Sequence, residues 1–136
     1  MKLIGLTGGI GSGKSVVASL IQVFGRLVYD SDARAKELYE EDERLKQGLI
    51  DLLGPDLYKE GQLDKPLLAS LIFQHKETLQ AVNQLVHPAV ERDFLRWVAS
   101  LSGHHTMVFQ ESAILFEAGW ERLFDAVVCV TAPEAL

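Results

Sequence analysis

The sequence predicts an α/β fold in which a parallel sheet is flanked by helices and interrupted by a helical insertion. Three observations support this. Short apolar strands alternate with helical patterns over about the first forty residues, the block from residue 33 to 103 contains no convincing strand, and strand character returns near residue 106. Such alternation is typical of parallel strands joined by helical crossovers.

The first two strands are each followed by a helical pattern. KLIGLT, from residue 2 to 7, is a short apolar run that predicts a buried strand, and a helical period follows it from Lys14 to a stop near Gly25. RLVYD predicts a second strand, and SDARAKELY predicts a helix capped by Ser31 or Asp32.

Four further helices are expected inside the insertion. One ends at Gly54, and another starts after Asp64 with a proline in its first turn, where proline is tolerated. A third, KETLQAVNQLVHP, should halt at or before Pro88, and a fourth, AVERDFLRWVASL, should follow it. This block is too long for one crossover, so we expect it to cap a site at the edge of the sheet.

The last two strands are TMVFQE and DAVVCVTAP, with a short helical turn, AGWERLF, between them. Three of the four expected strands end in polar residues, namely Thr7, Asp30 and Glu111. Ligands in open α/β sheets bind at the carboxyl ends of the strands. The polar ends therefore predict a site at that edge.

Composition narrows the function classes. The net charge of −6 argues against a nonspecific nucleic-acid binder, whose affinity comes mainly from lysine and arginine. The single cysteine, Cys129, lies in the apolar run AVVCV, so we expect a buried core thiol and no disulfide or zinc framework. No segment reaches eighteen apolar residues, and the N-terminus lacks a secretory signal, so we expect no membrane partner and a cytoplasmic location.

Residues 8–15, GGIGSGKS, match the pattern G-x-x-x-x-G-K-[ST] between a strand and a helix. Glycines allow successive backbone N–H groups to form a nest for an anion, and the following helix directs its N-terminal dipole at the same anion. Lys14 can then reach the β- and γ-phosphates of a nucleotide, and the Ser15 hydroxyl is placed to ligate Mg²⁺. The motif therefore predicts a P-loop NTPase-like fold.

Acidic residues near the loop have two interpretations each. Asp30 and Asp32 flank Ser31, and one of them could orient or deprotonate an attacking hydroxyl while the other caps a helix. The sequence does not choose between them. Glu111 lies where a Walker B carboxylate would lie, or is an exposed acid at a strand end, and Glu117 either orients substrate or faces solvent.

Five segments together resemble the dephospho-CoA kinase family: GLTGGIGSGKS, YDSDARAKEL, NQLVHPAV, AILFEAG and FDAVVCVTAPE. The resemblance covers essentially the whole chain. It implies Mg²⁺-dependent transfer of the ATP γ-phosphate to the ribose 3′-hydroxyl of dephospho-CoA. It also implies a nucleotide-binding core at 1–32 and 104–136 and a coenzyme-binding helical insertion at 33–103, in a monomer or small homo-oligomer.

The resemblance also implies residue roles. Asp32 would be the catalytic base, Lys14 would act on the phosphates, and the acceptor would contact Asp32, His87, Leu115 and Glu117. ATP would bind the loop residues Gly9, Gly11, Ser12, Gly13, Lys14, Ser15 and Val16.

The chain departs from the family pattern in three places. Val16 replaces the usual threonine, and Ala113-Ile114-Leu115 replaces Pro-Leu-Leu. Family members also continue into an arginine-bearing lid and a last strand, which we expect to be missing because this sequence stops at Leu136. One such arginine is worth about 10³-fold or more in rate, so we expect the 136-residue piece to be a poor catalyst.

Two other functions share the loop and the sheet. One is another small-molecule kinase, acting on a nucleoside or a sugar. The other is a noncatalytic nucleotide-binding module, although the guanine-reading pattern Asn-Lys-x-Asp is absent from this sequence. The segments VHPAV and ILFEAG favour the dephospho-CoA kinase interpretation over both.

Overall fold

The computed structural model of the chain describes residues 1–9, 11–101 and 103–132. Ile10 of the loop motif and Pro133 of the last expected strand lie outside these residues. By its internal contacts the chain divides into two compact units, Met1–Ala33 with Phe94–Leu136 and Arg34–Asp93. We call them the sheet unit and the helical unit. The expected insertion limits of 33 and 103 stay a prediction.

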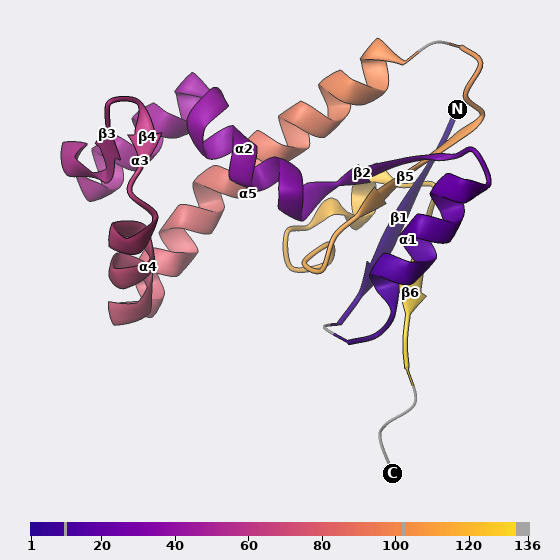
Figure 1. The fold of residues 1–136 in the computed structure, drawn as a ribbon, viewed down its shortest axis with the longest axis horizontal. Helices are drawn as coiled ribbons and strands as arrows, with labels where there is room; N and C mark the ends of the chain where they lie inside the picture. The colour runs from indigo at the N-terminus through magenta and orange to yellow at the C-terminus, as the bar shows by residue number, and fades with distance from the viewer. Residues whose placement is uncertain (10, 102, 133–136) are drawn as a thin grey trace. The chain divides into compact units, whose positions relative to one another are not determined.

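The sheet unit contains a four-stranded parallel sheet in the order β2-β5-β1-β6 (Figure 1). This confirms the predicted α/β fold and its parallel strands. The first crossover is α1, and a short 3₁₀ turn, η2, precedes the last strand. The elements are β1 (Lys2–Gly8), α1 (Lys14–Val23), β2 (Leu27–Asp30), β5 (Met107–Glu111), η2 (Trp120–Leu123) and β6 (Ala126–Val130).

Strand register brings the expected polar residues to one edge. Glu111 pairs with Leu6 of β1 on one side and with Asp30 of β2 on the other. Beyond the strand, the Ser112 amide donates to the Leu6 carbonyl at 2.9 Å, which continues the pairing by one residue. The carboxyl ends of β1, β2 and β5 therefore meet where the loop after β1 begins.

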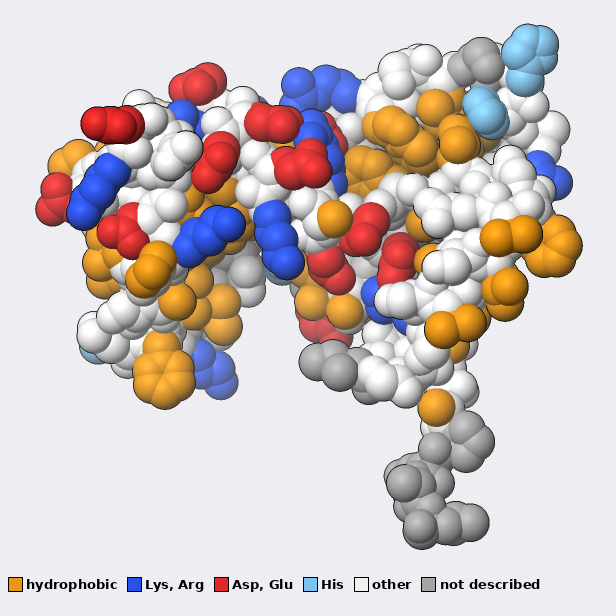
Figure 2. Space-filling model, viewed as in Figure 1, with side chains coloured by type: hydrophobic (Ala, Val, Ile, Leu, Met, Phe, Trp, Pro, Cys, Tyr) orange, Lys and Arg blue, Asp and Glu red, His pale blue; other side chains and the backbone are white. Residues whose placement is uncertain are grey.

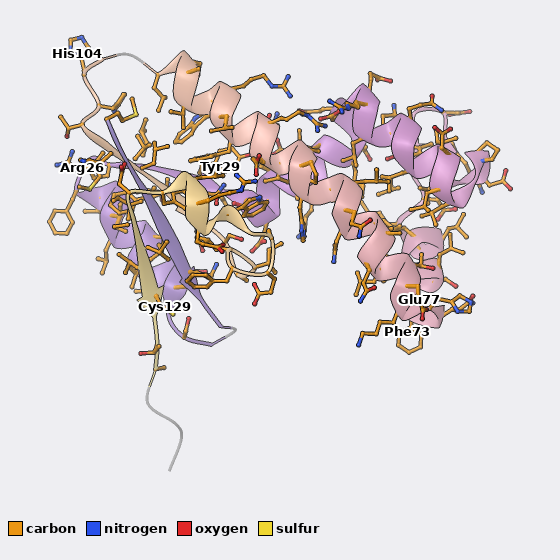
Figure 3. All side chains as sticks on the ribbon, turned by 180° about the vertical axis from the view of Figure 1, so that it is seen from behind. Arg26, Tyr29, Phe73, Glu77, His104 and Cys129 are labelled. Atoms are coloured by element: carbon orange, nitrogen blue, oxygen red, sulfur yellow. The ribbon has the colours of Figure 1, made fainter. Side chains whose placement is uncertain are left out.

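Tyr29 of β2 forms the centre of an aromatic cluster in the sheet unit. Its ring centroid lies 5.2 Å from that of Phe94 and 5.4 Å from that of Trp97, both on the last turns of α5 (Lys76–Ser100). Figure 3 shows Tyr29 between the strands and this helix. Phe124 extends the cluster, with its ring 5.7 Å from that of Phe94. Such aromatic pairs add about 0.5–1.5 kcal/mol each beyond simple burial.

The α1 helix buries little of its own surface, since Ala18 is its buried residue. Val16, Leu20, Val23 and Phe24 are all exposed, and Figure 2 shows a row of hydrophobic side chains over the position of α1. Of the apolar positions whose spacing predicted this helix, Val17 and Ile21 are half-buried, whereas Leu20 and Phe24 are exposed.

Cys129 is exposed, so the expectation of a buried core thiol is wrong. The reason is its place on β6, which pairs with β1 alone and forms one edge of the sheet within the described part of the chain (Figure 3). Continuous apolar runs are typical of strands covered on both faces, and β6 is not covered in this way.

The helical unit is built from the elements expected there, with two differences. Asp42 and Asp64 accept hydrogen bonds from the backbone N–H groups of Leu45 and Leu67 and so cap α3 and α4. Sequence patterns predicted both helices. The elements are α2 (Ser31–Glu41, which begins in the sheet unit), α3 (Glu43–Leu53), η1 (Pro55–Leu57), β3 (Tyr58–Lys59), β4 (Gln62–Leu63), α4 (Lys65–Gln74) and α5.

The first difference is a small antiparallel hairpin formed by β3 and β4, in a region where no strand was expected. Its turn has Glu60 and Gly61 with φ angles of 54° and 80°, as a type I′ turn requires. Strands of two residues carry too little periodicity to be recognised in a sequence.

The second difference is that α5 is one helix, so the expected break at Pro88 is wrong. Proline in a helix interior costs about 3 kcal/mol, because its ring displaces a backbone hydrogen bond. Val86, Ala89 and Val90 are buried on either side of the proline, whereas Pro88 itself is exposed. Burial on one face of the helix outweighs the cost on the other.

Arg34 ties the two ends of the helical unit together. Its guanidinium donates to Asp93 through Nε at 2.8 Å and through Nη2 at 3.1 Å, and it also pairs with Glu37 and Glu41. The hydrogen bonds to Asp93 raise the pKa of Arg34. Among the described residues, no helix is long and apolar enough to cross a membrane.

Candidate active site

The loop between β1 and α1 has the backbone that phosphate binding requires. Gly11 and Gly13 have φ angles of 78° and 91°, which residues other than glycine rarely adopt. The Ser12 amide donates to the Gly9 carbonyl at 3.1 Å and closes the turn. Gly13 is the N-cap of α1 and supplies no side-chain cap, so the first N–H groups of the helix remain for a ligand.

Gly8 closes the base of this loop against β6. A Cβ atom at Gly8 would lie 2.6 Å from Ser12 Oγ and 2.7 Å from the Val130 carbonyl oxygen. Both distances are shorter than real contacts, so only glycine fits this position without a shift of its neighbours. At Gly9 a Cβ atom would meet nothing within 4 Å.

The loop borders a pocket with a volume of about 400 Å³. Every predicted ATP-binding residue lines it, and so does the predicted base Asp32. The lining residues are Gly8, Gly9, Gly11, Ser12, Gly13, Lys14, Ser15, Val16, Asp32 and Ala113. A second pocket of about 400 Å³ shares Gly9, Gly11 and Ser12 and continues along residues 129–132.

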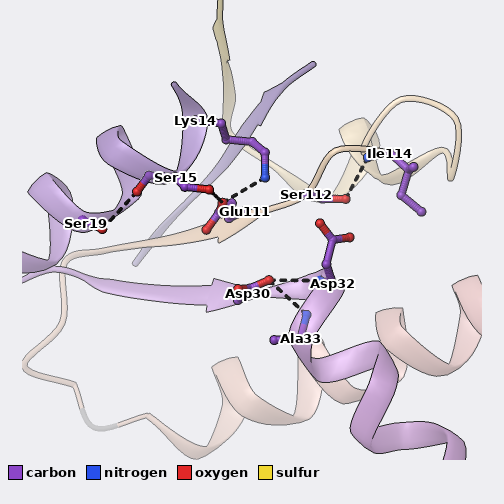
Figure 4. Close-up of polar contacts among 9 residues, drawn as sticks. All are labelled: Lys14, Ser15, Ser19, Asp30, Asp32, Ala33, Glu111, Ser112 and Ile114. Atoms are coloured by element: carbon purple, nitrogen blue, oxygen red, sulfur yellow. Dashed lines mark hydrogen bonds and ion pairs between the residues drawn. The ribbon is translucent and has the colours of Figure 1, made fainter. Parts of the chain in front are cut away.

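Lys14, which lines this pocket, forms an ion pair with Glu111. Its Nζ lies 2.9 Å from Glu111 Oε1, and the two side chains are 12% and 10% exposed. The Ser15 hydroxyl also donates to Glu111 Oε1, at 3.5 Å (Figure 4). One carboxylate oxygen therefore contacts both the cation of the loop and the first hydroxyl of the helix.

The structure separates the two aspartates that the sequence left open. Asp30 Oδ1 accepts hydrogen bonds from the backbone N–H groups of Asp32 and Ala33, both at 3.1 Å, and so caps α2. The Ser31 and Asp32 side chains do not make these capping bonds. Asp32 lines the pocket of the loop, and Figure 4 shows its carboxylate pointing from the start of α2 toward the side on which Lys14 and Glu111 lie.

The other predicted acceptor residues lie outside the lining of this pocket. Leu115 is fully buried, and its Cδ1 packs on Gly5. Glu117 is exposed on the turn after β5, and His87 is half-buried on α5 in the helical unit. Their roles toward an acceptor stay predictions.

Sequence reasoning weighed Glu111 but did not include it among the site residues, and it passed over Ser112. Ser112 Oγ accepts a hydrogen bond from the Ile114 amide at 3.1 Å and shapes the turn that brings Ala113 to the pocket. The available signal was position, because Glu111 ends β5 beside Asp30, the last residue of β2, and Ser112 follows it directly.

The side chains present suit a magnesium ion that arrives with a nucleotide. Among the described residues, no group of three His, Cys, Asp or Glu side chains could hold a metal by itself. Ser15 and Glu111 offer hard oxygen donors, and Mg²⁺ sites of this kind use one or two protein ligands together with substrate phosphates.

A parallel sheet, a glycine loop between its first strand and helix, a lysine that opens that helix and a carboxylate on a neighbouring strand together define a P-loop protein. The comparisons with known proteins specify the kind. The family model described as dephospho-CoA kinase matches residues 2–136, so the chain belongs to the dephospho-CoA kinase family.

Curated relatives carry the same name. The chain is 44% identical over 136 residues to a dephospho-CoA kinase of Porphyromonas gingivalis, covering 100% of this chain and 66% of the relative. It is 41% identical over 133 residues to one of Bacteroides fragilis, covering 96% of this chain and 63% of the relative. The chain thus spans slightly less than two thirds of the length of these relatives.

Solved structures share the fold. The crystal structure of TT1252 from Thermus thermophilus matches with a TM-score of 0.78 and 39% identity, over 97% of this chain and 66% of that one. A dephospho-CoA kinase from Campylobacter jejuni matches with a TM-score of 0.72 and 22% identity, over 93% of this chain and 64% of that one, and shows the fold alone.

Proposed function

We propose that the chain phosphorylates the ribose 3′-hydroxyl of dephospho-CoA with ATP and so forms coenzyme A. The observation that carries this proposal is the position of Asp32 in the same pocket as the phosphate loop. A phosphate cradle without a carboxylate base suits a binding module, whereas a base beside the cradle suits transfer to an alcohol. The names of the relatives supply the acceptor.

The loop residues bind and orient the nucleotide. Backbone N–H groups of the loop and of the first turn of α1 donate to the β- and γ-phosphates, and Lys14 moves from Glu111 to the same oxygens. Ser15 and Glu111 would hold Mg²⁺, which neutralises phosphate charge when bound. The second pocket, along residues 129–132, gives the nucleoside half of ATP a place beside the loop.

Asp32 prepares the acceptor. Its carboxylate takes the proton of the 3′-hydroxyl while the alcohol oxygen forms a bond to the γ-phosphorus. The bond between that phosphorus and the oxygen bridging to the β-phosphate breaks, and ADP leaves with this oxygen. The proton thus ends on Asp32 and the phosphoryl group on the acceptor.

The insertion at 33–103 is proposed to bind the coenzyme part of the acceptor, with His87, and with Leu115 and Glu117 from the turn after β5. The substrates ATP and dephospho-CoA favour a cytoplasmic location. These assignments rest on the family, and each of them can be tested by substituting the residue on its own.

A single-turnover assay tests the proposal. Enzyme in excess of γ-labelled ATP, with Mg²⁺ and dephospho-CoA, should form labelled coenzyme A, and Asp32→Asn should slow this transfer by about 10²–10⁴-fold. Single-turnover conditions allow a slow enzyme to be measured.

Asp30→Asn is the matched control for Asp32→Asn. It removes the same charge two residues away, and asparagine caps helices as well as aspartate does. We expect a rate close to that of the wild type. Transfer to adenosine or gluconate but not to dephospho-CoA would instead favour another small-molecule kinase, and tight GTP binding without transfer would favour a switch.

A further inference from the structure

One carboxylate oxygen engages the two side chains that a nucleotide needs. Glu111 Oε1 contacts Lys14 Nζ at 2.9 Å and Ser15 Oγ at 3.5 Å, in a place where the Lys14 and Glu111 side chains are about nine-tenths buried. Lys14 and Ser15 line the loop pocket, and Glu111 places a negative charge within contact of both side chains (Figure 4).

We propose that Glu111 makes nucleotide binding depend on a divalent cation: it holds Lys14 until a nucleotide arrives together with the metal. This rests on the proposed nucleotide site. A metal-free phosphate has to draw Lys14 away and leave a partly buried carboxylate without its cation, which is costly. The same phosphate also comes close to the carboxylate, and like charges repel strongly where water is scarce.

A cation beside Ser15 and Glu111 removes both penalties, since it replaces Lys14 as the partner of the carboxylate. Neither ligand is expected to bind well alone. The described residues contain no group of three ligating side chains that could hold the metal without phosphate oxygens. Because coupling between two ligands is reciprocal, each should strengthen the binding of the other by the same factor, typically about 5–150-fold.

The test compares ATP binding in excess EDTA with ATP binding in Mg²⁺, measured by titration calorimetry. The wild type should bind at least about 10-fold more weakly in EDTA. In Glu111→Gln, an amide that keeps the size of the side chain replaces the carboxylate. This variant should bind metal-free ATP at least about 10-fold more tightly than the wild type does. The dissociation constants measured in EDTA and in Mg²⁺ should therefore differ less than they do in the wild type.

Two further variants keep the result interpretable. Glu121→Gln removes the same charge from an exposed residue of the sheet unit, and its affinities should equal those of the wild type in both conditions. Glu111→Asp keeps the charge but retracts it by one methylene, and it should give an intermediate ratio. Should Glu111→Gln misfold, this variant still reports on the contact.

One result would contradict this inference alone, and a different result would contradict the proposed function as well. If Glu111→Gln binds metal-free ATP no more tightly than the wild type, Glu111 does not set the metal dependence and the inference is overturned. If the wild type binds no ATP even with Mg²⁺, the proposed function itself fails, and the inference fails with it.

Discussion

Two aspartates two residues apart have different surroundings, because the chain changes from strand to helix between them. Asp30 is the last residue of β2, so its carboxylate folds over the first N–H groups of α2. Asp32 lies within the first turn of α2, and its side chain lines the loop pocket. The change from strand to helix at one peptide thus separates a structural acid from a catalytic candidate.

The loop allows a prediction on Gly8 and Gly9. Gly8→Ala should lower the free energy of unfolding by about 1–3 kcal/mol, because the new methyl group would lie against Ser12 Oγ and a backbone carbonyl that cannot move freely. Gly9→Ala should change it by less than about 1 kcal/mol, since its methyl group meets open space. Urea unfolding of the ligand-free protein measures both.

The test depends on the difference in the free energy of unfolding between Gly8→Ala and Gly9→Ala. Equal losses would mean that the loop does not close on β6 in the way that the Gly8 contacts require. A stable Gly8→Ala variant would mean the same.

The part of the site that was predictable from sequence is the part that the backbone itself builds. The glycines, Lys14 and Ser15 follow from a motif whose spacing is set by one phosphate cradle. The choice between Asp30 and Asp32 was not predictable, because both residues cap helices well and the boundary can shift by one residue. The contact between Glu111 and Lys14 joins residues 97 positions apart, and only the sheet register reveals it.

At the scale of elements, local signals failed where tertiary packing opposed them. Pro88 is a strong local break signal, yet α5 continues through it because Val86, Ala89 and Val90 are buried around it. Where local and tertiary signals agreed, as at Asp64, after which a helix was expected and which caps α4, the start of the helix was predicted well.

The β3–β4 hairpin gives a prediction at this scale. Glu60 has a φ of 54°, which is unfavourable for a glutamate, and it precedes Gly61 in the turn. Glu60→Asn should raise the free energy of unfolding by about 0.5–1 kcal/mol, because asparagine tolerates this backbone and Asn-Gly is the preferred pair in type I′ turns. Urea unfolding monitored by circular dichroism measures this, and the variant should unfold at a higher midpoint concentration of urea than the wild type.

Gln62→Asn tests whether the effect belongs to the turn. Gln62 is an exposed strand residue of the same hairpin, and asparagine is disfavoured in strands. We expect no gain there. A similar gain in the free energy of unfolding at both positions would mean that the turn conformation is not its cause.

For the molecule as a whole, the alternation of the sheet strands β1 and β2 with the helices α1 and α2 was predictable, because the apolar pattern changes between a strand and a helix. Which surfaces are covered was not, since coverage depends on the neighbours of an element. Cys129 lies in an apolar run, and Leu20 and Phe24 follow an apolar helical spacing, yet all three are exposed.

The exposed row on α1 predicts self-association of the chain. Val23 and Phe24 are 78% and 81% exposed, and Val16 and Leu20 continue the row along the helix. Contiguous apolar surface of this kind is a site of association, whereas single exposed apolar residues are ordinary. The sedimentation coefficient should therefore rise with protein concentration, and Phe24→Glu should reduce that rise while leaving the circular dichroism spectrum unchanged.

Phe73→Glu is the matched control, because Phe73 is 91% exposed but lies on α4, outside the row. An equal reduction by both substitutions, or a wild-type coefficient that is independent of concentration, would show that the α1 row does not drive association.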